Sequence, residues 1–347
     1  MRAILLREFG GVEHFYEAEL PAPAVRAGDV LVRVRAASFN PVDYKRRAGH
    51  FGGALPLALG HDAAGVVEAV GEGVSGLSAG DEVCAFLGDS RGPQSNGGYA
   101  ELVAVPAQLV ARKPAGLSWT EAAAVPTAGL SAYEAIVRHA ALSRGQSVLI
   151  TGASGGVGSF AVPLCLRLGA ASIVATAGSE RSAAYLAELG VAKESVISHR
   201  GATPAELAER AIAANGGRRF DVALDLVGGD MKRLACEAVG FGGRVVTLVE
   251  EPEERAFPVF DGQKSPLFAR SASLHFEMLG ARAASGGPAD WEIYREELSA
   301  LLALIESGQI RSVRTEDLGA LSVETVREGH RRLEAGGVQG KLAMTVG

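Results

Sequence analysis

A glycine-rich loop between an apolar strand and an amphipathic helix carries the strongest chemical signal in the sequence. Residues 147–151 read SVLIT, a continuous apolar run typical of a buried strand, and Val157–Leu168 has helical spacing of apolar residues. The loop brings backbone N–H groups and the positive end of a helix to one place, which suits a phosphate. The residues of this predicted anion site are Gly152, Ala153, Ser154, Gly155, Gly156, Val157 and Gly158.

Read from Ala153, the loop fits A-x-G-x-x-G, the dinucleotide fingerprint with alanine in place of its first glycine. Gly155 would let the backbone approach a pyrophosphate, and Gly158 would let the helix pack closely on the strand. An ordinary glycine-rich turn is the alternative. The strand before the loop and the helix after it favour dinucleotide binding.

The end of the second strand decides between NAD and NADP. A site for NAD places an acidic residue there, about 20 residues after the loop. Here Gly178 and Ser179 occupy the strand end, and Arg181 can reach a 2′-phosphate, so the sequence favours NADP(H). Two alternatives remain: Glu180 serves NAD if the strand ends later, or Glu180 and Arg181 only begin a solvated helix.

Cysteine usage and composition exclude several classes of protein. Cys84, Cys165 and Cys236 are scattered without a CxxC pair, which excludes a disulfide framework and a cysteine zinc cluster. The formal net charge is 34 − 40 = −6, so nucleic acid is not the expected partner. The amino terminus does not resemble a signal peptide, and no long uninterrupted apolar run is present. We therefore expect a cytoplasmic protein without a membrane partner.

The pattern of elements changes twice along the 347 residues, which suffice for about two domains. Before residue 120, short strands such as Asp29–Ala37 alternate with glycine turns, which indicates an antiparallel β domain. A helix is expected over Thr120–Leu142, followed by alternating strands and helices up to the strand Ser273–Met278. This alternation predicts an α/β fold with a doubly wound parallel sheet. The tail is too small to fold alone, so it should pack on the first domain.

Motifs along essentially the whole chain identify it by resemblance as a zinc-free medium-chain dehydrogenase/reductase of the quinone oxidoreductase (zeta-crystallin-like) branch. The resemblance implies a GroES-like domain from residues 1–125 and 283–347, and a Rossmann NADP(H)-binding domain over 126–282. The matching segments are SFNPVD (38–43), GHDAAGVV (60–67), GDEV (80–83), GGYAE (97–101), AVPTAG (124–129), the loop 152–158 and DLVGG (225–229).

Zinc-dependent relatives hold their metal through a Cys, a His-Glu pair and a second Cys or Asp. At these positions this sequence has Asn40, the pair His61 and Asp62, and a residue near Pro126. One histidine does not make a site that needs three protein ligands. The segment 88–98, where relatives carry a structural zinc lobe, has no cysteine. We expect no metal, and we expect His61 to be a hydrogen-bonded structural residue.

A site without a metal suits acceptors that are already electrophilic, so the resemblance implies hydride transfer to a quinone or an α,β-unsaturated carbonyl. An enoyl reductase acting on a biosynthetic, polyketide-like intermediate and a cofactor-binding structural or regulatory protein with little turnover are the alternatives. The resemblance places these residues at the cofactor: Asn40 and Thr127 near the nicotinamide and its ribose, Val227, Val249 and Phe276 along the cleft, Lys341 from the tail, and His199 where relatives often have a tyrosine near the 2′-phosphate.

The proton donor is harder to identify from the sequence. Asn40 precedes Pro41 as a helix N-cap would, and Tyr44 follows four residues later on the same face. Tyr44 and Asn40 are therefore the catalytic candidates, while a packing role for Tyr44 and solvent as the donor remain open.

Substrate contacts and assembly are also expectations at this point. Phe51, Phe86 and Phe260 are candidates for the apolar substrate pocket. Relatives pair through an edge strand of the nucleotide domain, and Ser273–Met278 is the last strand, so we expect a homodimer.

Overall fold

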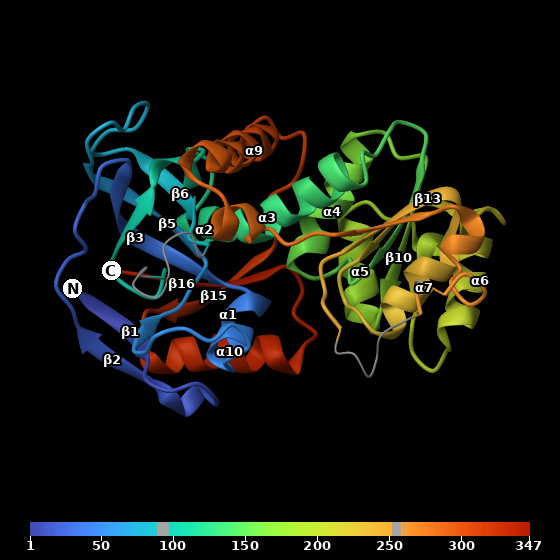
Figure 1. The fold of residues 1–347 in the computed structure, drawn as a ribbon, viewed down its shortest axis with the longest axis horizontal. Helices are drawn as coiled ribbons and strands as arrows, with labels where there is room; N and C mark the ends of the chain where they lie inside the picture. Colours follow the sequence, from blue (N-terminus) through green and yellow to red (C-terminus); the bar gives the residue numbers. More distant parts are fainter. Residues whose placement is uncertain (89–96, 252–257, 260) are drawn as a thin grey trace. The chain divides into compact units, whose positions relative to one another are not determined.

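The computed structural model describes residues 1–88, 97–251, 258–259 and 261–347 (Figure 1). The chain forms two compact units. Unit 1 comprises Met1–Leu130, Leu279–Gly308 and Ser312–Gly347, and unit 2 comprises Ser131–Met278 and Gln309–Arg311. Each unit is described separately below.

Unit 1 is built mainly from antiparallel strands. One sheet has three strands in the order β2-β1-β4, and the other has seven, with the path β15-β16-β3-β5-β6-β8 and β7 paired to β3. Only β15 and β16 pair in parallel among these strands of the described chain. The strands are β1 (Arg2–Leu6), β2 (Phe15–Glu19), β3 (Asp29–Phe39), β4 (Leu57–Ala58), β5 (Asp62–Val70), β6 (Glu82–Phe86), β7 (Leu102–Pro106), β8 (Val110–Arg112), β15 (Thr315–Ala320) and β16 (Lys341–Thr345).

Helices complete unit 1. They are α1 (Pro41–Arg47), α2 (Trp119–Ala123), α3 (Pro126–Tyr133, which begins in unit 1), α8 (Ala281–Ser285), α9 (Pro288–Glu306) and α10 (Val323–Ala335), with short 3-10 turns η1 (Val12–His14) and η3 (Ala107–Leu109). The carboxyl-terminal strand β16 pairs with β3 in the same sheet as the amino-terminal strands. The prediction that the tail packs on the first domain is therefore confirmed.

Strand register explains why distant polar residues meet in unit 1. In the antiparallel pair β16 and β3, Leu342 lies opposite Phe39, so Lys341 comes next to Asn40. In the pair β3 and β5, Ser38 lies opposite Asp62. Three neighbouring strand ends thus bring the polar side chains of Ser38, Asn40, Asp62 and Lys341 to one edge of the sheet.

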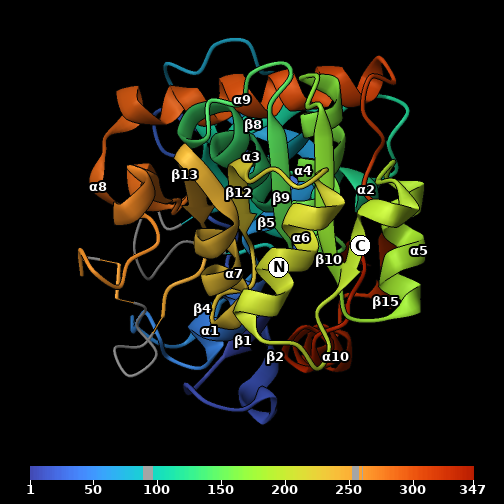
Figure 2. The same ribbon diagram turned by 90° about the vertical axis from the view of Figure 1, so that its right-hand side faces the viewer.

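Unit 2 is a six-stranded sheet in which every strand pair is parallel (Figure 2). The strand order is β11-β10-β9-β12-β13-β14, which is the doubly wound dinucleotide-binding order. The strands are β9 (Ser147–Thr151), β10 (Ser172–Ala177), β11 (Val196–Ser198), β12 (Phe220–Asp225), β13 (Val239–Thr247) and β14 (Ser273–Phe276). The predicted fold class is confirmed.

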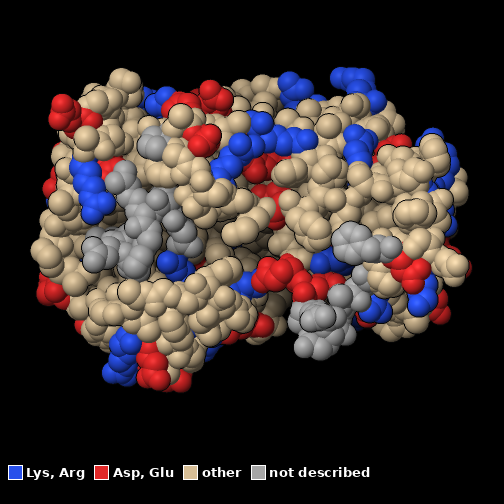
Figure 3. Space-filling view, viewed as in Figure 1, with Lys and Arg blue, Asp and Glu red and all other residues tan. Residues whose placement is uncertain are grey.

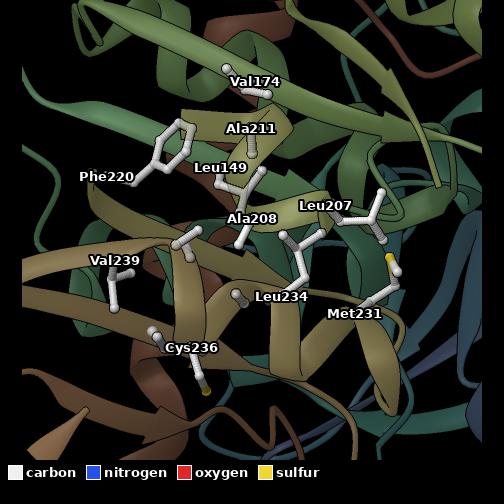
Figure 4. Packing of buried hydrophobic residues seen from close by; sticks show 14 of the residues in the cluster. Leu149, Val174, Leu207, Ala208, Ala211, Phe220, Met231, Leu234, Cys236 and Val239 are labelled. Carbon is white, nitrogen blue, oxygen red and sulfur yellow. The ribbon is translucent and has the colours of Figure 1, made fainter. Parts of the chain in front are cut away.

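Helices connect these strands and bury their apolar side chains. They are α4 (Gly156–Arg167), α5 (Glu180–Glu188), α6 (Pro204–Ala214) and α7 (Asp230–Ala238), with a π-helical turn η4 (Glu134–His139) and 3-10 turns η5 (Lys193–Ser195) and η7 (Phe268–Arg270). Figure 4 shows Leu207 of α6 and Leu234 of α7 packed with strand residues such as Leu149 and Phe220. All five residues of β9 are buried, as its continuous apolar sequence predicts.

The loop between β9 and α4 depends on glycine at two positions: Gly152, whose φ is +67°, and Gly158. A Cβ at Gly158 would lie 2.3 Å from the carbonyl oxygen and 2.4 Å from the Cα of Ala153. These are backbone atoms, so they cannot move aside as a flexible side chain does. A Cβ at Gly155, the N-cap of α4, would meet only the carbonyl oxygen of Gly152, at 3.4 Å. Protein packing therefore requires glycine at 158 and leaves space at 155.

A buried histidine joins several elements of unit 1. His330 of α10 is fully buried, and its ring lies 4.9 Å from Phe15 and 6.2 Å from Phe39, centroid to centroid. The hydroxyl group of Tyr99 lies 3.2 Å from His330 Nε2. Burial lowers the pKa of His330 from 6.5 to about 4, although the charge of Asp43 acts to raise it. His330 is thus held in its neutral form.

Several elements differ from the sequence-based expectation. The expected helix over 120–142 is divided into α2, α3 and η4, because Pro126 lacks an N–H and disfavours helical geometry in the residue before it. The strands β1, β2, β4, β8 and β15 were not predicted. In β15 the burial pattern does not alternate, so the pattern of period two that reveals other strands is missing.

The surface agrees with the composition. On the face drawn in Figure 3, Lys and Arg lie among Asp and Glu, which is not the concentrated basic surface that nucleic acid requires. Among the residues that the structure describes, no helix combines the length and apolar character needed to cross a membrane.

Substituting Gly158 should destabilise the fold, whereas substituting Gly155 should not. We expect Gly158→Ala to lower the free energy of unfolding by about 1–3 kcal/mol, because the new methyl group overlaps backbone atoms of Ala153. The matched variant Gly155→Ala should lose less than about 1 kcal/mol, since only an N-cap preference changes. Denaturant unfolding without nucleotide measures both values. Equal losses would show that the close approach at Gly158 is not needed.

The neutral state of His330 predicts how stability depends on pH. The unfolded chain takes up this proton near pH 6.5 and the folded chain only near pH 4, so stability falls as the pH falls through this window. The contribution is about 3 kcal/mol. In His330→Gln the loss between pH 6.5 and pH 4 should be smaller by about that amount. Urea unfolding of both proteins at several pH values tests this, and parallel curves would contradict it.

Candidate functional site

One buried carboxylate organises the polar edge of the large sheet in unit 1. Asp62 is fully buried at the first position of β5. Its Oδ2 accepts hydrogen bonds from Ser38 Oγ at 2.7 Å and from Asn40 Nδ2 at 2.8 Å. Its Oδ1 accepts from the backbone N–H of Thr127 at 2.8 Å and from Thr127 Oγ1 at 2.6 Å. The carboxylate thus receives four hydrogen bonds from three residues, which lie in two distant segments of the chain.

The contact with Thr127 also explains how α3 begins. Thr127 is the second residue of α3, so its N–H has no carbonyl partner within the helix. Asp62 accepts this N–H from another part of the chain, and a negative charge is favourable at the amino end of a helix. The half-buried side chain of Thr127 is thereby fixed relative to the sheet.

Lys341 provides the compensating positive charge. Its ammonium group lies 3.5 Å from Asp62 Oδ2 and donates to the carbonyl oxygen of Phe39 at 3.0 Å. It also donates to Asn40 Oδ1. Burial lowers the pKa of Lys341, while the charges of Asp62 and Asp43 act to raise it. The structure therefore brings together three of the predicted cofactor residues: Asn40, Thr127 and Lys341.

A second buried carboxylate pairs with His61. Asp43 Oδ1 lies 2.6 Å from His61 Nδ1, and Asp43 Oδ2 accepts the backbone N–H of Asn40 at 2.8 Å. Burial acts to raise the pKa of Asp43, but the charge and hydrogen bond of His61 lower it, and the net shift is downward. His61 is hydrogen-bonded, as predicted. In the described part of the chain, no three His, Cys, Asp or Glu side chains are grouped to hold a metal ion.

The catalytic candidates occupy different positions in this arrangement. Asn40 is the N-cap of α1 by its backbone, and Pro41 is the first helical residue, as predicted. The side chain of Asn40, however, bonds to Asp62 and Lys341 rather than to the helix. Tyr44 is half-buried on α1, and no hydrogen bond among the described residues joins its hydroxyl group to the Asp62 network.

The pocket candidates are not equivalent in the structure. Phe86 is buried, with its ring centroid 5.3 Å from that of Tyr294, so it is a core residue. Phe51 is half-exposed, and Phe260 lies outside the described residues. The expectation that Phe86 lines a substrate pocket is therefore wrong.

In unit 2 the glycine loop 152–158 lies between the end of β9 and the start of α4, as predicted. The space at Gly155 is the test of whether a dinucleotide fits. Since no protein atom fills this space closely, glycine there serves no packing need, whereas a pyrophosphate bound close to the backbone would need it. The residues present therefore fit a dinucleotide.

Asp225 holds three strand ends together beside this loop. Fully buried at the end of β12, it accepts hydrogen bonds from Thr151 of β9 at 3.2 Å and from Thr247 of β13 at 2.8 Å. It also accepts the backbone N–H of Val227 at 3.2 Å and of Gly228 at 2.9 Å. The turn after β12 is thereby fixed, with Val227 half-exposed at its tip.

The remaining predicted cofactor residues also lie near strand ends of unit 2. Strand β10 ends at Ala177, as predicted, and Gly178 follows, with His199 Nε2 2.8 Å from where its Cβ would be. Ser179 is the N-cap of α5, and its hydroxyl group accepts from the N–H of Ser182 at 3.1 Å. Glu180 and Arg181 are exposed in the first turn of that helix, Val249 follows β13 and is half-buried, and Phe276 is exposed at the end of β14.

The sequence analysis did not recognise Asp43, Asp62 and Asp225 as organising residues. Each is fully buried and accepts several hydrogen bonds. For Asp62 and Asp225 the available signal was an acidic residue at the first or last position of an otherwise apolar strand, as in DAAGVV and DVALD, whereas Asp43 lies in helix α1. Which donors such a carboxylate collects depends on strand register, and the sequence alone does not give that register.

Comparison with known proteins matches both parts of the chain. The family profile described as "Alcohol dehydrogenase GroES-like domain" matches residues 26–115, and the one described as "Zinc-binding dehydrogenase" matches residues 193–344. A crystal structure of an alcohol dehydrogenase superfamily protein from Novosphingobium aromaticivorans is similar over 100% of both chains, with a TM-score of 0.85 and 29% identity.

Three curated relatives are similar in sequence. The tomato 2-methylene-furan-3-one reductase is 37% identical, and the chloroplastic NADPH-dependent alkenal/one oxidoreductase of Arabidopsis thaliana is 34% identical. Each match covers 72% of this chain but only 62% of the relative. The rat quinone oxidoreductase is 32% identical over 72% of this chain and 73% of its own length. This chain belongs to the medium-chain dehydrogenase/reductase family of oxidoreductases.

Proposed function

We propose that this protein is an NADPH-dependent, zinc-independent reductase of quinones or α,β-unsaturated carbonyl compounds. The observation that carries the proposal is the environment of Asp62. Its carboxylate accepts four hydrogen bonds from protein groups. Its neighbours are the carboxamide of Asn40 and the ammonium group of Lys341. A carboxylate engaged in this way, beside an ammonium group, is a poor ligand for zinc.

This donor set favours acceptors that need no Lewis acid. Reduction of a ketone or oxidation of an alcohol in metal-dependent enzymes uses an ion to polarise oxygen. A quinone or an enone accepts a hydride without that help, because its carbonyl group delocalises the added charge. The names of the tomato, Arabidopsis and rat relatives describe reductases of this kind, which supports the same substrate class.

The cofactor supplies the hydride when it is bound, and the protein supplies its binding and orientation. In our proposal the loop 152–158 and the amino end of α4 bind the pyrophosphate, and Arg181 binds the 2′-phosphate. Asn40 and Thr127 contact the nicotinamide and its ribose, while Lys341 holds Asn40. Val227, Val249, Phe276, Gly178 and His199 complete the proposed cofactor contacts. Tyr44 remains the candidate for the proton donor, with solvent as the alternative.

We also propose a homodimer. Strand β14 ends the row of strands in unit 2, so one side of it has no strand partner among the described residues. Phe276 and Met278 are exposed at its end, at 68% and 62%. Edge strands with exposed apolar residues tend to pair with another chain. Sedimentation at micromolar concentration should give the mass of two chains, and a monomer would refute the proposal.

The decisive test of the function is NADPH oxidation followed at 340 nm against quinones, alkenals and enones. We expect turnover of at least one of these classes and none of simple alcohols with NADP⁺. Dialysis against a strong chelator should leave the rate unchanged, and metal analysis should find no zinc in stoichiometric amount. Loss of activity in chelator with recovery on adding zinc would contradict the proposed metal-free site.

Arg181 should determine the preference for NADPH over NADH. Its side chain is exposed in the first turn of α5, and the hydroxyl group of Ser179 is already engaged with Ser182. A guanidinium–phosphate contact contributes about 1.5–3 kcal/mol, so Arg181→Ala should raise KM for NADPH roughly tenfold to a hundredfold. KM for NADH should hardly change.

Glu180→Gln is the matched control for this variant. Glu180 is the exposed neighbour of Arg181 in the same helical turn, and we expect its substitution to change neither KM appreciably. If Arg181→Ala weakens both cofactors equally, the assignment to the 2′-phosphate is wrong. A wild-type preference for NADH would instead assign the ribose contact to Glu180.

A further inference from the structure

The protons around Asp62 can be assigned without ambiguity. An ionised carboxylate only accepts hydrogen bonds, so both groups of Thr127 that touch it must donate. The hydroxyl proton of Thr127 therefore lies on the 2.6 Å line from Oγ1 to Asp62 Oδ1. A hydroxyl group has one proton, so Thr127 Oγ1 can only accept a hydrogen bond from any further partner.

The orientation of the Asn40 carboxamide follows from the same matching of donors with acceptors. Lys341 only donates and Asp62 only accepts, and the carboxamide of Asn40 lies between them. Its Nδ2 must face Asp62, and its Oδ1 must face Lys341. The reversed carboxamide would set two donors against each other at Lys341 and two acceptors against each other at Asp62. Asp62 and Lys341 together permit one orientation.

The ammonium group of Lys341 has little capacity left to donate further hydrogen bonds. Its ammonium group has three protons, and it faces the Phe39 carbonyl oxygen, Asn40 Oδ1 and Asp62 Oδ2. The residue is only 4% exposed. Lys341 therefore acts on a ligand through Asn40 and through its charge.

We propose that Asp62 is a positioning residue that makes Thr127 an obligatory hydrogen-bond acceptor, so that this position selects a ligand hydroxyl group that donates. The inference rests on the proposed function, in which that hydroxyl group belongs to the nicotinamide ribose. It adds the direction of the hydrogen bond and the residue that sets it. Asp62 acts through Thr127 and Asn40 and does not itself touch the ligand.

The direction of the bond can be tested with the unaltered protein. The probes are NADPH analogues in which a nicotinamide-ribose hydroxyl group is replaced by hydrogen or by fluorine. Fluorine accepts but does not donate, so both analogues should bind roughly two- to tenfold more weakly than NADPH, by fluorescence titration. Thr127→Val should bind the three nucleotides alike, whereas Thr127→Ser should retain the discrimination. A fluorine analogue that binds as tightly as NADPH would overturn the inference.

The role of Asp62 is tested by Asp62→Asn with Ser38→Ala as its control. An asparagine at 62 can accept from Thr127 only if its amide nitrogen faces Asn40 and Lys341, where another donor cannot be accommodated. We expect kcat/KM to fall about ten- to hundredfold and the discrimination between NADPH and its analogues to disappear. Ser38→Ala removes one hydrogen bond to the same carboxylate but keeps both bonds from Thr127, so it should lower stability and retain the discrimination between NADPH and its analogues.

Exchanging the side chains of residues 40 and 62 should restore the discrimination that Asp62→Asn loses. In the double variant Asn40→Asp with Asp62→Asn, the aspartate again accepts from both neighbours, and the amide oxygen at 62 can accept from Thr127. Discrimination between NADPH and its analogues should return, even if kcat stays low because Asn40 itself is altered. Discrimination that survives in Asp62→Asn alone would overturn the role of Asp62.

The outcomes separate this inference from the proposed function. If wild type binds neither NADPH nor NADH, the proposed function and this inference are both overturned. If wild type binds the hydrogen and fluorine analogues as tightly as it binds NADPH, only the inference is overturned. Should Asp62→Asn fail to fold, the analogue titrations with wild type, Thr127→Val and Thr127→Ser still decide the direction of the hydrogen bond.

Discussion

The structure of unit 1 depends on compensating the charge of a buried carboxylate. An ionised group without partners in a protein interior is so costly that it would become neutral or unfold the chain. Asp62 avoids this because donors from β3, residue 40 and α3 reach it, together with an ammonium group from β16. The elements that carry these groups must therefore be in place together, which couples the carboxyl-terminal tail to the middle of the chain.

Unit 2 also contains a buried carboxylate that is surrounded by hydrogen-bond donors, but here the donors are neutral groups. Asp225 accepts from two threonines on neighbouring strands and from two backbone N–H groups of the turn that follows β12. It also fixes the turn containing Val227 close to the loop 152–158 through Thr151. In both units, an acidic residue at the end of an apolar strand aligns the groups proposed to contact the cofactor.

A fixed hydrogen-bond arrangement of this kind supports the proposed function of a reductase that uses a diffusible cofactor. Hydride transfer needs orientation more than acid–base power from the protein, because the cofactor provides the reactive bond. Side chains whose donor and acceptor atoms are fixed by neighbouring groups present a constant hydrogen-bonding pattern to a ligand. The family assignment gives the class of reaction, and the arrangement around Asp62 supports the proposal that no metal takes part in it.

Local patterns determined much of this protein from its sequence. The apolar run 147–151, the glycines after it and the alternation of strands and helices were sufficient for the nucleotide-binding fold and for the position of its loop. The end of β10 at Ala177 and the N-cap at Asn40 were also predicted correctly, because capping and strand termination depend on neighbouring residues. The family followed from motifs distributed along the chain.

Tertiary structure decided the partners of the buried acids. The family resemblance placed Asn40 near the cofactor, but its bonds to Asp62 and Lys341 join residues 22 and 301 positions away. Phe86 was taken for a pocket residue, although only packing against Tyr294 shows that it belongs to the core. A residue type states how many hydrogen bonds a side chain can make. The register between strands far apart in sequence determines which partners those hydrogen bonds have, and this register exists only once the chain has folded.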